Sequence, residues 1–164
     1  MRNLLILGAG QYGFVAKETA QAMGGFDRID FLDDNSPLAI GKMADAERLH
    51  SNYDATFVAL GNPVLRRQWI DQLESWGYEL PVLQHPQSTV MPSAVVGKGS
   101  IVEAQAVVNS NAQVGIACLV CAGAVINHNA VVEDYSQIDC HAIVFARSHV
   151  PANSKIPCGE VFKD

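Results

Sequence analysis

Apolar side chains recur at a fixed interval through the C-terminal half of the chain. From Val90 to Phe162 every sixth residue is aliphatic or aromatic. The series is Val90, Val96, Val102, Val108, Val114, Val120, Ile126, Val132, Ile138, Val144, Val150, Ile156 and Phe162. A period of six matches neither an amphipathic helix nor an alternating strand, and a fixed repeat is the signature of a repeat architecture. The pattern predicts a parallel β-helix, in which short strands turn corners around a narrow core.

A small residue stands two positions before each apolar residue, from Ser88 to Ser154, and only Glu160 departs from this rule. If three hexads form one coil, residues 18 apart stack on one another, as Val108, Ile126 and Val144 would. Each stacked column is then branched and apolar, as a core shared between neighbouring coils requires. We expect about four coils over residues 85–164.

The first part of the chain, residues 1–84, alternates short apolar runs with helical patterns. Strands are expected within residues 3–10, 28–34, 54–62 and 78–86, and helices over residues 11–24 and 63–77. Gly24 and Gly77 stand where the two helices should stop, and Pro63 stands where the second should start. Strands that alternate with helices imply a parallel sheet with crossover connections. At this length the part can only be half of a doubly wound α/β fold.

The charge and hydrophobicity of the chain limit which partners and which cellular locations are expected. The formal net charge is −6, which argues against a nucleic-acid surface because such a surface needs a basic patch. No stretch of ~18 apolar residues is present, so no membrane insertion is expected. The start of the chain, MRNLLILGAG, lacks the pattern of a signal peptide. These features predict a cytoplasmic protein.

The four cysteines are expected to be thiols rather than disulfides. Cys118 occupies the small position of its hexad, and no second pair completes a four-ligand zinc site with Cys118 and Cys121. No metal is therefore expected. Cys140 and Cys158 hold the same place three hexads apart. They would stack at the strand spacing of ~4.8 Å, where a disulfide is geometrically conceivable.

A glycine-rich turn is the first candidate site. Residues 8–13 read Gly-Ala-Gly-Gln-Tyr-Gly between an expected strand and an expected helix. Glycines allow a ligand to approach the backbone, and a helix N-terminus favours phosphate oxygens. Asp33 and Asp34 end the second expected strand, where an acidic residue can bond a sugar hydroxyl, and Gly61 and Asn62 end the third. Together they favour a nucleotide-type ligand over a purely structural turn.

His128 is the second candidate. It follows Ile126 by two positions, at an expected turn. A histidine that titrates near neutral pH can act as a general base, for example by removing a proton from an amine or hydroxyl that attacks a thioester. On spacing alone, a corner histidine in solvent or at a subunit contact is the commoner interpretation. His50 and His85 are interpreted as structural, and His141 and His149 as surface or interface residues.

The combination resembles a known family. An α/β half domain with GAGQYG, FLDD, ALGN and LQHP, followed by hexapeptide repeats with GAVINHN, resembles the PglD/NeuD-type sugar acetyltransferases along essentially the whole chain. The resemblance implies a Rossmann-like half domain followed by a left-handed β-helix. It also implies a homotrimer in surface-polysaccharide synthesis that uses acetyl-CoA as co-substrate and a nucleotide-activated amino sugar or sialic-acid-like sugar as substrate.

The resemblance also implies roles for particular residues. His128 matches the catalytic base, and Asn129 stands where many members have an acidic partner. Gln137 and Ala146 fall in the acetyl-CoA groove. The stretches that bind the sugar nucleotide contain Gly8, Gly10, Gln11, Tyr12, Asp33, Asp34, Gly61 and Asn62.

Two alternatives stay open at this point. Asn129, Gln137 and the end of the array at Phe162 favour a trimeric sugar-nucleotide-binding protein with reduced catalysis. The glycine turn alone also fits an NAD-type oxidoreductase, although no second mononucleotide half follows it.

Overall fold

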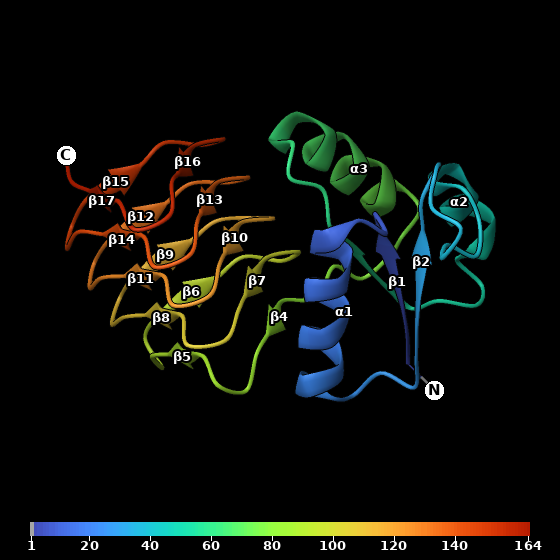
Figure 1. The fold of residues 1–164 in the computed structure, drawn as a ribbon, viewed down its shortest axis with the longest axis horizontal. Helices are drawn as coiled ribbons and strands as arrows, with labels where there is room; N and C mark the ends of the chain where they lie inside the picture. The colour runs from blue at the N-terminus through green and yellow to red at the C-terminus, as the bar shows by residue number, and fades with distance from the viewer. Residues whose placement is uncertain (1) are drawn as a thin grey trace. The chain divides into compact units, whose positions relative to one another are not determined.

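The computed structural model describes residues 2–164, which form two compact units. One unit ends at Pro81 and the other begins at Val82. Among the described residues no helix combines the length and the apolar character needed to cross a membrane. All strand pairings in both units are parallel (Figure 1).

The N-terminal unit is a three-stranded sheet with crossover helices. The strands are β1 (Asn3–Leu7), β2 (Arg28–Leu32) and β3 (Ala55–Val58), and their order in the sheet is β2-β1-β3. Helix α1 (Gln11–Met23) joins β1 to β2, and a short 3₁₀ turn (Met43–Asp45) and α2 (Ala46–Leu49) lie between β2 and β3. Helix α3 (Pro63–Ser75) follows β3. The predicted parallel half of a doubly wound fold is confirmed.

The residues between α3 and the repeats differ from the single strand expected over 78–86. Glu79 pairs with Ala55 through an isolated parallel bridge in the first unit. Leu83 and Gln84 instead form β4, which pairs with Ile101 and Val102 of the second unit. The apolar run is therefore divided, because its second half continues the stacking of the first coil.

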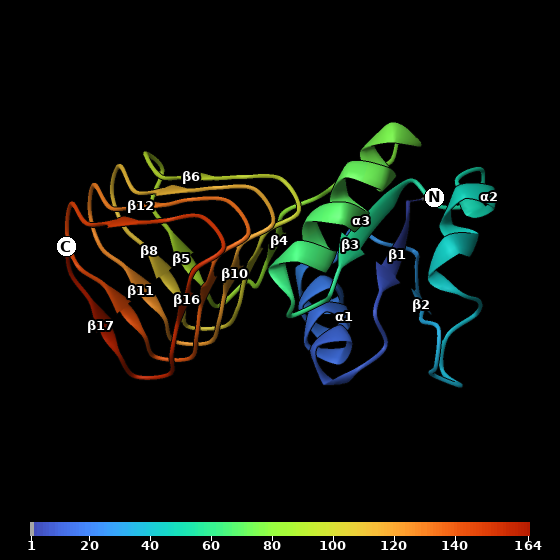
Figure 2. The same cartoon turned by 90° about the horizontal axis from the view of Figure 1, so that it is seen from above.

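The C-terminal unit is a three-sided parallel β-helix, seen from above in Figure 2. One sheet contains β4 (Leu83–Gln84), β7 (Ile101–Val102), β10 (Leu119–Val120), β13 (Gln137–Ile138) and β16 (Lys155–Ile156). A second contains β5 (Thr89–Val90), β8 (Val107–Val108), β11 (Val125–Ile126), β14 (Ile143–Val144) and β17 (Val161–Phe162). The third contains β6 (Val95–Val96), β9 (Gln113–Val114), β12 (Val131–Val132) and β15 (His149–Val150).

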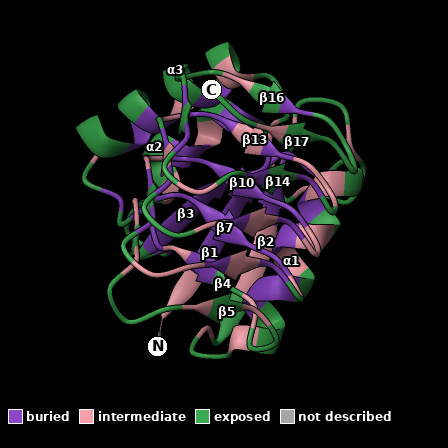
Figure 3. Cartoon of the chain, turned by 90° about the vertical axis from the view of Figure 1, so that its left-hand side faces the viewer, coloured by how far each residue is buried: buried purple, intermediate pink, exposed green. Residues whose placement is uncertain are grey.

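The stacked columns predicted from the period are confirmed by the strand register. Ile126 pairs with Val108 on one side and with Val144 on the other. The side chains of these columns form one buried cluster together with the small residues two positions earlier. Figure 3 shows buried residues along the strands and exposed residues mainly on turns and helix surfaces. The branched side chains thus fill the core, and the small ones let the corners close.

From residue 99 onward, each turn of the β-helix contains a residue with positive φ. These are Gly99, Gln105, Asn111, Ala117, Gly123, Asn129, Tyr135, His141, Arg147, Asn153 and Gly159. Most of them carry a Cβ atom, which makes the left-handed region unfavourable. The coil-to-coil hydrogen bonds offset this cost, as where Asn129 N donates to Ser110 O at 3.0 Å.

The four cysteines are all free. Cys118 is fully buried in the core cluster, which confirms its interpretation as a small inward residue. Cys140 is half-buried and Cys158 is exposed.

Candidate functional site

The glycine turn is shaped by close backbone packing at the carboxyl end of β1. Gly8 has φ +104, and a Cβ atom there would lie 2.9 Å from Ala59 O. Gly8 N donates to Leu32 O at 2.8 Å. A Cβ on Gly13 would collide with Gly8 O. The first and last glycines of the motif are therefore required by the packing of α1 against the turn, whatever ligand binds.

The N-terminus of α1 is open to an anion. Gly10 caps the helix without a side-chain hydrogen bond, and the first turn of α1 contains no acidic residue. A Cβ added to Gly10 would meet nothing within 4 Å. Gln11 is exposed, and Tyr12 is half-buried. Backbone N–H groups at a helix N-terminus favour phosphate or carboxylate oxygens.

Asp33 connects the glycine turn to the loop after β2. Its Oδ2 accepts a hydrogen bond from Ala9 N at 2.8 Å, and its Oδ1 accepts from Asn35 N at 2.8 Å and Ser36 N at 3.0 Å. The hydrogen bonds from Ala9 and Asn35 lower the pKa of Asp33. This carboxylate therefore shapes the site in addition to the ligand role expected for it.

A hollow of about 350 Å³ lies beside this loop. Its lining includes Asp33, Asp34, Lys42 and Asp45. Lys42 Nζ donates to Asp34 O, and Lys42 N donates to Asp45 Oδ2 at 2.8 Å. Lys42 and Asp45 are not predicted from the sequence as site residues, because residues 35–53 carry no periodic pattern that would place them near the sheet edge.

Asn62 and Arg66 hold the turn after β3. Asn62 Oδ1 caps α3 by accepting from Val64 N at 2.9 Å and Leu65 N at 3.2 Å. Arg66 is only 1% exposed and donates to Leu60 O at 2.7 Å and Gly61 O at 3.3 Å. A charged residue on the otherwise apolar stripe of Arg66, Ile70 and Leu73 is the sequence signal that could have identified it.

His128 lies at an exposed corner of the β-helix, between β11 and β12. Its backbone N–H donates to Asn127 Oδ1 at 2.8 Å, and its Nδ1 lies 3.3 Å from Asn129 Oδ1. An amide oxygen can only accept, so a hydrogen bond at this contact requires the ring proton to be on Nδ1. The Nε2 lone pair is then left to act as a base.

Ala146 lies at the same corner one coil later, since Val125 and Ile126 pair with Ile143 and Val144. The equivalent N–H groups of Ser110 and His128 donate to the side chains of Asn109 and Asn127. Phe145 stands in the corresponding place before Ala146. Within residues 2–164 the Ala146 N–H consequently has no acceptor.

Gln137 is not brought to this corner within one chain. It belongs to β13, on the sheet opposite the corner of His128, and its Nε2 lies 3.9 Å from Cys121 Sγ. The other histidines lie apart from the site residues. His50 packs edge-on against Tyr78, His85 Nδ1 accepts from Gln87 N, and His141 and His149 are exposed.

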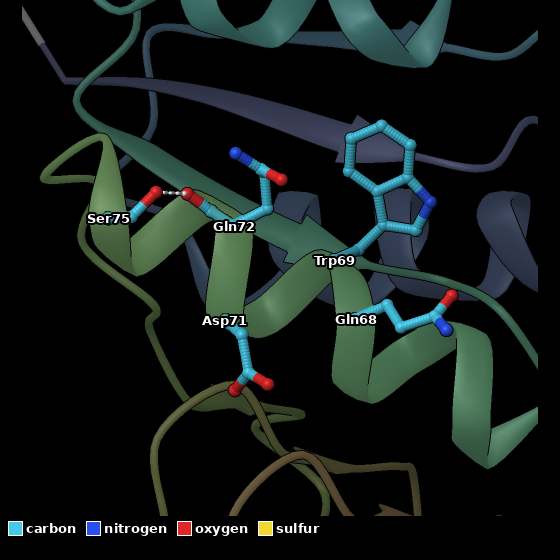
Figure 4. Close-up of a pocket in the computed structure, with 5 residues that line it drawn as sticks. All are labelled: Gln68, Trp69, Asp71, Gln72 and Ser75. Atoms are coloured by element: carbon cyan, nitrogen blue, oxygen red, sulfur yellow. Dashed lines mark hydrogen bonds between the residues drawn. The ribbon is translucent and has the colours of Figure 1, made fainter.

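A larger hollow of about 620 Å³ runs along α3 (Figure 4). Its lining residues are Gln68, Trp69, Asp71, Gln72 and Ser75. Ser75 Oγ donates to Gln72 O at 2.6 Å. The hollow contains none of the candidate residues and lies beyond the first turn of α3, away from the sheet edge with Asp33 and Asn62.

Comparisons with known proteins agree with this geometry. Residues 3–73 match the family model described as the PglD N-terminal domain. The acetyltransferase domain of PglB from Neisseria gonorrhoeae is 32% identical with a TM-score of 0.94, over 98% of this chain and 82% of that one. The same domain in complex with acetyl coenzyme A is 33% identical with a TM-score of 0.92, over 98% and 81% of the two chains.

A perosamine N-acetyltransferase from Caulobacter crescentus, in complex with CoA and GDP-perosamine, shares the fold. Its identity is 21% and its TM-score 0.80, over 99% of this chain and 89% of that one. No curated protein matches the chain.

A three-stranded α/β half domain joined to a β-helix with a corner histidine defines a hexapeptide-repeat acyltransferase. At the level of family, the chain belongs to the PglD-type sugar acetyltransferases. The predicted left-handed β-helix and the predicted enzyme class, an acyl-CoA-dependent sugar acetyltransferase, are thereby confirmed. The oxidoreductase alternative is not supported.

Proposed function

We propose that this protein transfers the acetyl group of acetyl-CoA to the amine of a nucleotide-activated amino sugar, with His128 as general base. The observation that carries the proposal is the corner at which His128 and the open N–H of Ala146 occupy successive coils. One group can accept a proton there, and the other can donate a hydrogen bond to an oxyanion.

In the proposed reaction, His128 Nε2 removes a proton from the sugar nitrogen as that nitrogen attacks the thioester carbonyl. A nitrogen–carbon bond forms, the carbonyl oxygen becomes an oxyanion, and the carbon–sulfur bond then breaks. The proton held by His128 passes to the CoA sulfur as the thiol leaves. A positioned base of this kind contributes roughly 10²–10⁴-fold to the rate.

Ala146 is assigned to the developing negative charge. Its backbone N–H needs no rearrangement to donate, because the acceptor side chain found in the two preceding coils is replaced by Phe145. Preorganised donors at an oxyanion are among the largest contributions to catalysis. The assignment of Gln137 to the acetyl-CoA groove remains a prediction.

The N-terminal unit is proposed to bind the nucleotide part of the substrate. Gly10, Gln11 and Tyr12 begin α1, whose uncapped N-terminus suits a diphosphate. Asp34 lines the hollow beside β2, where its carboxylate can accept from sugar or ribose hydroxyls. The amide nitrogen of Asn62 can add a donor, because its oxygen already caps α3.

The protein is further proposed to form a homotrimer. The outer face of the β6, β9, β12 and β15 sheet has a hollow of about 310 Å³ lined by Val95, Val131 and their neighbours, and Val95 is 61% exposed. Light scattering coupled to size exclusion measures the mass directly. A mass of one chain at micromolar concentration contradicts a trimer.

A thiol assay tests the reaction. Purified protein is mixed with acetyl-CoA and a panel of UDP-, dTDP- and GDP-linked amino sugars, and released CoA is followed with a thiol reagent. The wild type is expected to release CoA with at least one sugar, and His128→Ala is expected to lose about 10²–10⁴-fold of that rate.

His141→Asn is the matched control, because His141 is an exposed corner histidine with φ 56, a conformation that asparagine tolerates. Equal rates for the wild type and His128→Ala contradict the assignment of the base. Thermal stabilisation by a nucleotide sugar without CoA release by any sugar would favour the binding protein with reduced catalysis.

A further inference from the structure

One corner of the β-helix gathers side chains that the proposed reaction does not use. Asp139 and Cys140 follow β13, and Cys158 occupies the turn position of Cys140 one coil later. A carboxylate oxygen of Asp139 and the two sulfur atoms all lie within 4.8 Å of one another. Gly159 N donates to Cys140 O at 3.0 Å, which fixes the two turns in register.

The groups at this corner already contact each other. The Cys140 N–H donates to Asp139 Oδ1 at 2.9 Å, and the Cys158 sulfur lies within 4.8 Å of the Asp139 carboxylate. Lys155 Nζ lies 3.4 Å from Asp139 Oδ2, on a side chain that is 61% exposed. Asp139 therefore lies beside one cationic group and two sulfur atoms.

The surroundings are rich in acidic and thiol groups. Burial raises the pKa of the Cys140 thiol, and the nearby carboxylates of Glu103 and Asp139 raise it further. Burial likewise raises the pKa of Cys121 in the preceding coil. Disulfide exchange requires a thiolate, so Cys140 is a poor redox centre by itself. The carboxylates of Glu103 and Asp139 near Cys140 favour a cation at this corner by their negative charge.

We propose that Asp139, Cys140 and Cys158 form a binding site for one thiophilic divalent cation of the zinc type. Zinc takes thiolate and carboxylate ligands in tetrahedral geometry, with water completing a three-ligand site. With Zn–S bonds of about 2.3 Å, two coordinated sulfurs lie about 3.8 Å apart. The two sulfur atoms lie within 4.8 Å of each other, so they need to approach by at most about 1 Å.

The bound cation links two successive coils, because Cys140 and Cys158 belong to neighbouring turns. Lys155 competes with it, since the ammonium group occupies one side of the Asp139 carboxylate. The sequence alone predicts no metal, because no second pair of ligands follows Cys118 and Cys121 at zinc-site spacing. The coil instead brings together cysteines that are eighteen residues apart.

Cobalt(II) is the probe, because thiolate coordination gives it a near-ultraviolet charge-transfer band. Reduced full-length protein is titrated with cobalt(II) in the absence of CoA and sugar. We expect a thiolate band that saturates at one equivalent per chain and is lost on addition of one equivalent of zinc(II). Cys140→Ser and Cys158→Ser are each expected to weaken cobalt(II) binding at least tenfold.

Two further variants sharpen the test. Cys118→Ala removes a buried cysteine from the core, at a hexad position where other hexads have alanine, and is expected to keep the band. Lys155→Met removes the competing ammonium group and is expected to tighten cobalt(II) binding several-fold. Both cysteine variants should keep the wild-type circular dichroism spectrum, since Cys140 and Cys158 lie outside the core cluster.

The proposal is overturned if no thiolate band appears, or if the band persists in both cysteine variants. It is also overturned if thiol counting of protein purified without reductant shows Cys140 and Cys158 joined as a disulfide that only a reductant opens. Asp139→Asn provides a third test, because it leaves both sulfur atoms in place. If this variant binds cobalt(II) as tightly as the wild type, Asp139 is not a ligand and the proposed three-residue site is wrong.

Discussion

His128 Nδ1 lies 3.3 Å from Asn129 Oδ1, so a neutral amide rather than a carboxylate orients the candidate base. Asn129 itself has φ 59, a conformation that asparagine accepts more readily than most residues. The same residue therefore permits the turn and sets the ring tautomer. A carboxylate there would also stabilise the imidazolium form by its charge.

Replacing Asn129 by glycine keeps the positive φ but removes the hydrogen-bond acceptor. We expect kcat to fall by about 10-fold, the equivalent of one hydrogen bond of roughly 1.4 kcal/mol. Asn129→Asp should instead move the acid limb of the pH–rate profile to higher pH. The CoA-release assay across pH measures both, and identical profiles for the three proteins would show that Asn129 does not act through His128.

Ala146→Pro tests the oxyanion donor, because proline has no backbone N–H group. Pro92 occupies the same turn position three coils earlier, and proline is favoured at the first central residue of a turn. We expect kcat to fall by about 10²–10³-fold, as for loss of one oxyanion-hole donor, while Tm changes little. Ala104→Pro is the matched control at a different corner, where Pro86 holds the equivalent position one coil earlier.

Asp33→Asn should weaken both the fold and the nucleotide site. The amide can no longer accept from all three N–H donors of Ala9, Asn35 and Ser36. We expect a loss of about 1–3 kcal/mol in the free energy of unfolding at pH 7, measured with urea. A nucleotide-sugar titration by calorimetry should show weaker binding.

The pH dependence of this difference follows from the lowered pKa of Asp33. A carboxyl group whose pKa is lower in the folded state stabilises the protein above its unfolded pKa, near the ordinary 3.8, and loses this effect as pH falls through the folded value. The difference in free energy of unfolding between the wild type and Asp33→Asn should therefore decrease as the pH falls below about 3.8. A gap that widens on acidification would contradict the structural role of the carboxylate.

Arg66→Leu tests the buried guanidinium. The substitution leaves Leu60 O and Gly61 O without the hydrogen bonds that Arg66 donates. We expect a loss of about 1–3 kcal/mol of stability and weaker nucleotide-sugar binding, with kcat at saturation nearly unchanged. Arg67→Leu is the control on the exposed side of the same helix. If kcat changes more than KM, Arg66 affects the acetyl-transfer step and does not act only by holding the turn after β3.

The hexad period alone predicted much of the architecture. Val108, Ile126 and Val144 stack as expected, because a parallel coil of three hexads leaves only one register in which every branched side chain faces inward. The alternating pattern of the first 84 residues likewise predicted β1 to β3, α1 and α3. Local periodicity determines such elements because it specifies which face of each must be buried.

The sequence by itself determined the repeat, the parallel half sheet and the candidate histidine, since each depends on residues near one another in the chain. Only the tertiary structure decided the roles of residues that meet through contacts distant in the sequence. In the folded chain, Asp33 accepts hydrogen bonds from backbone N–H groups, and the buried Arg66 donates to the carbonyl groups of the turn that contains Gly61. The Ala146 N–H, without an acceptor among residues 2–164, lies one coil from His128. The fold also brings Cys140 and Cys158 to one corner. Coiling places residues eighteen apart at strand spacing, so their chemistry appears only when the chain is folded.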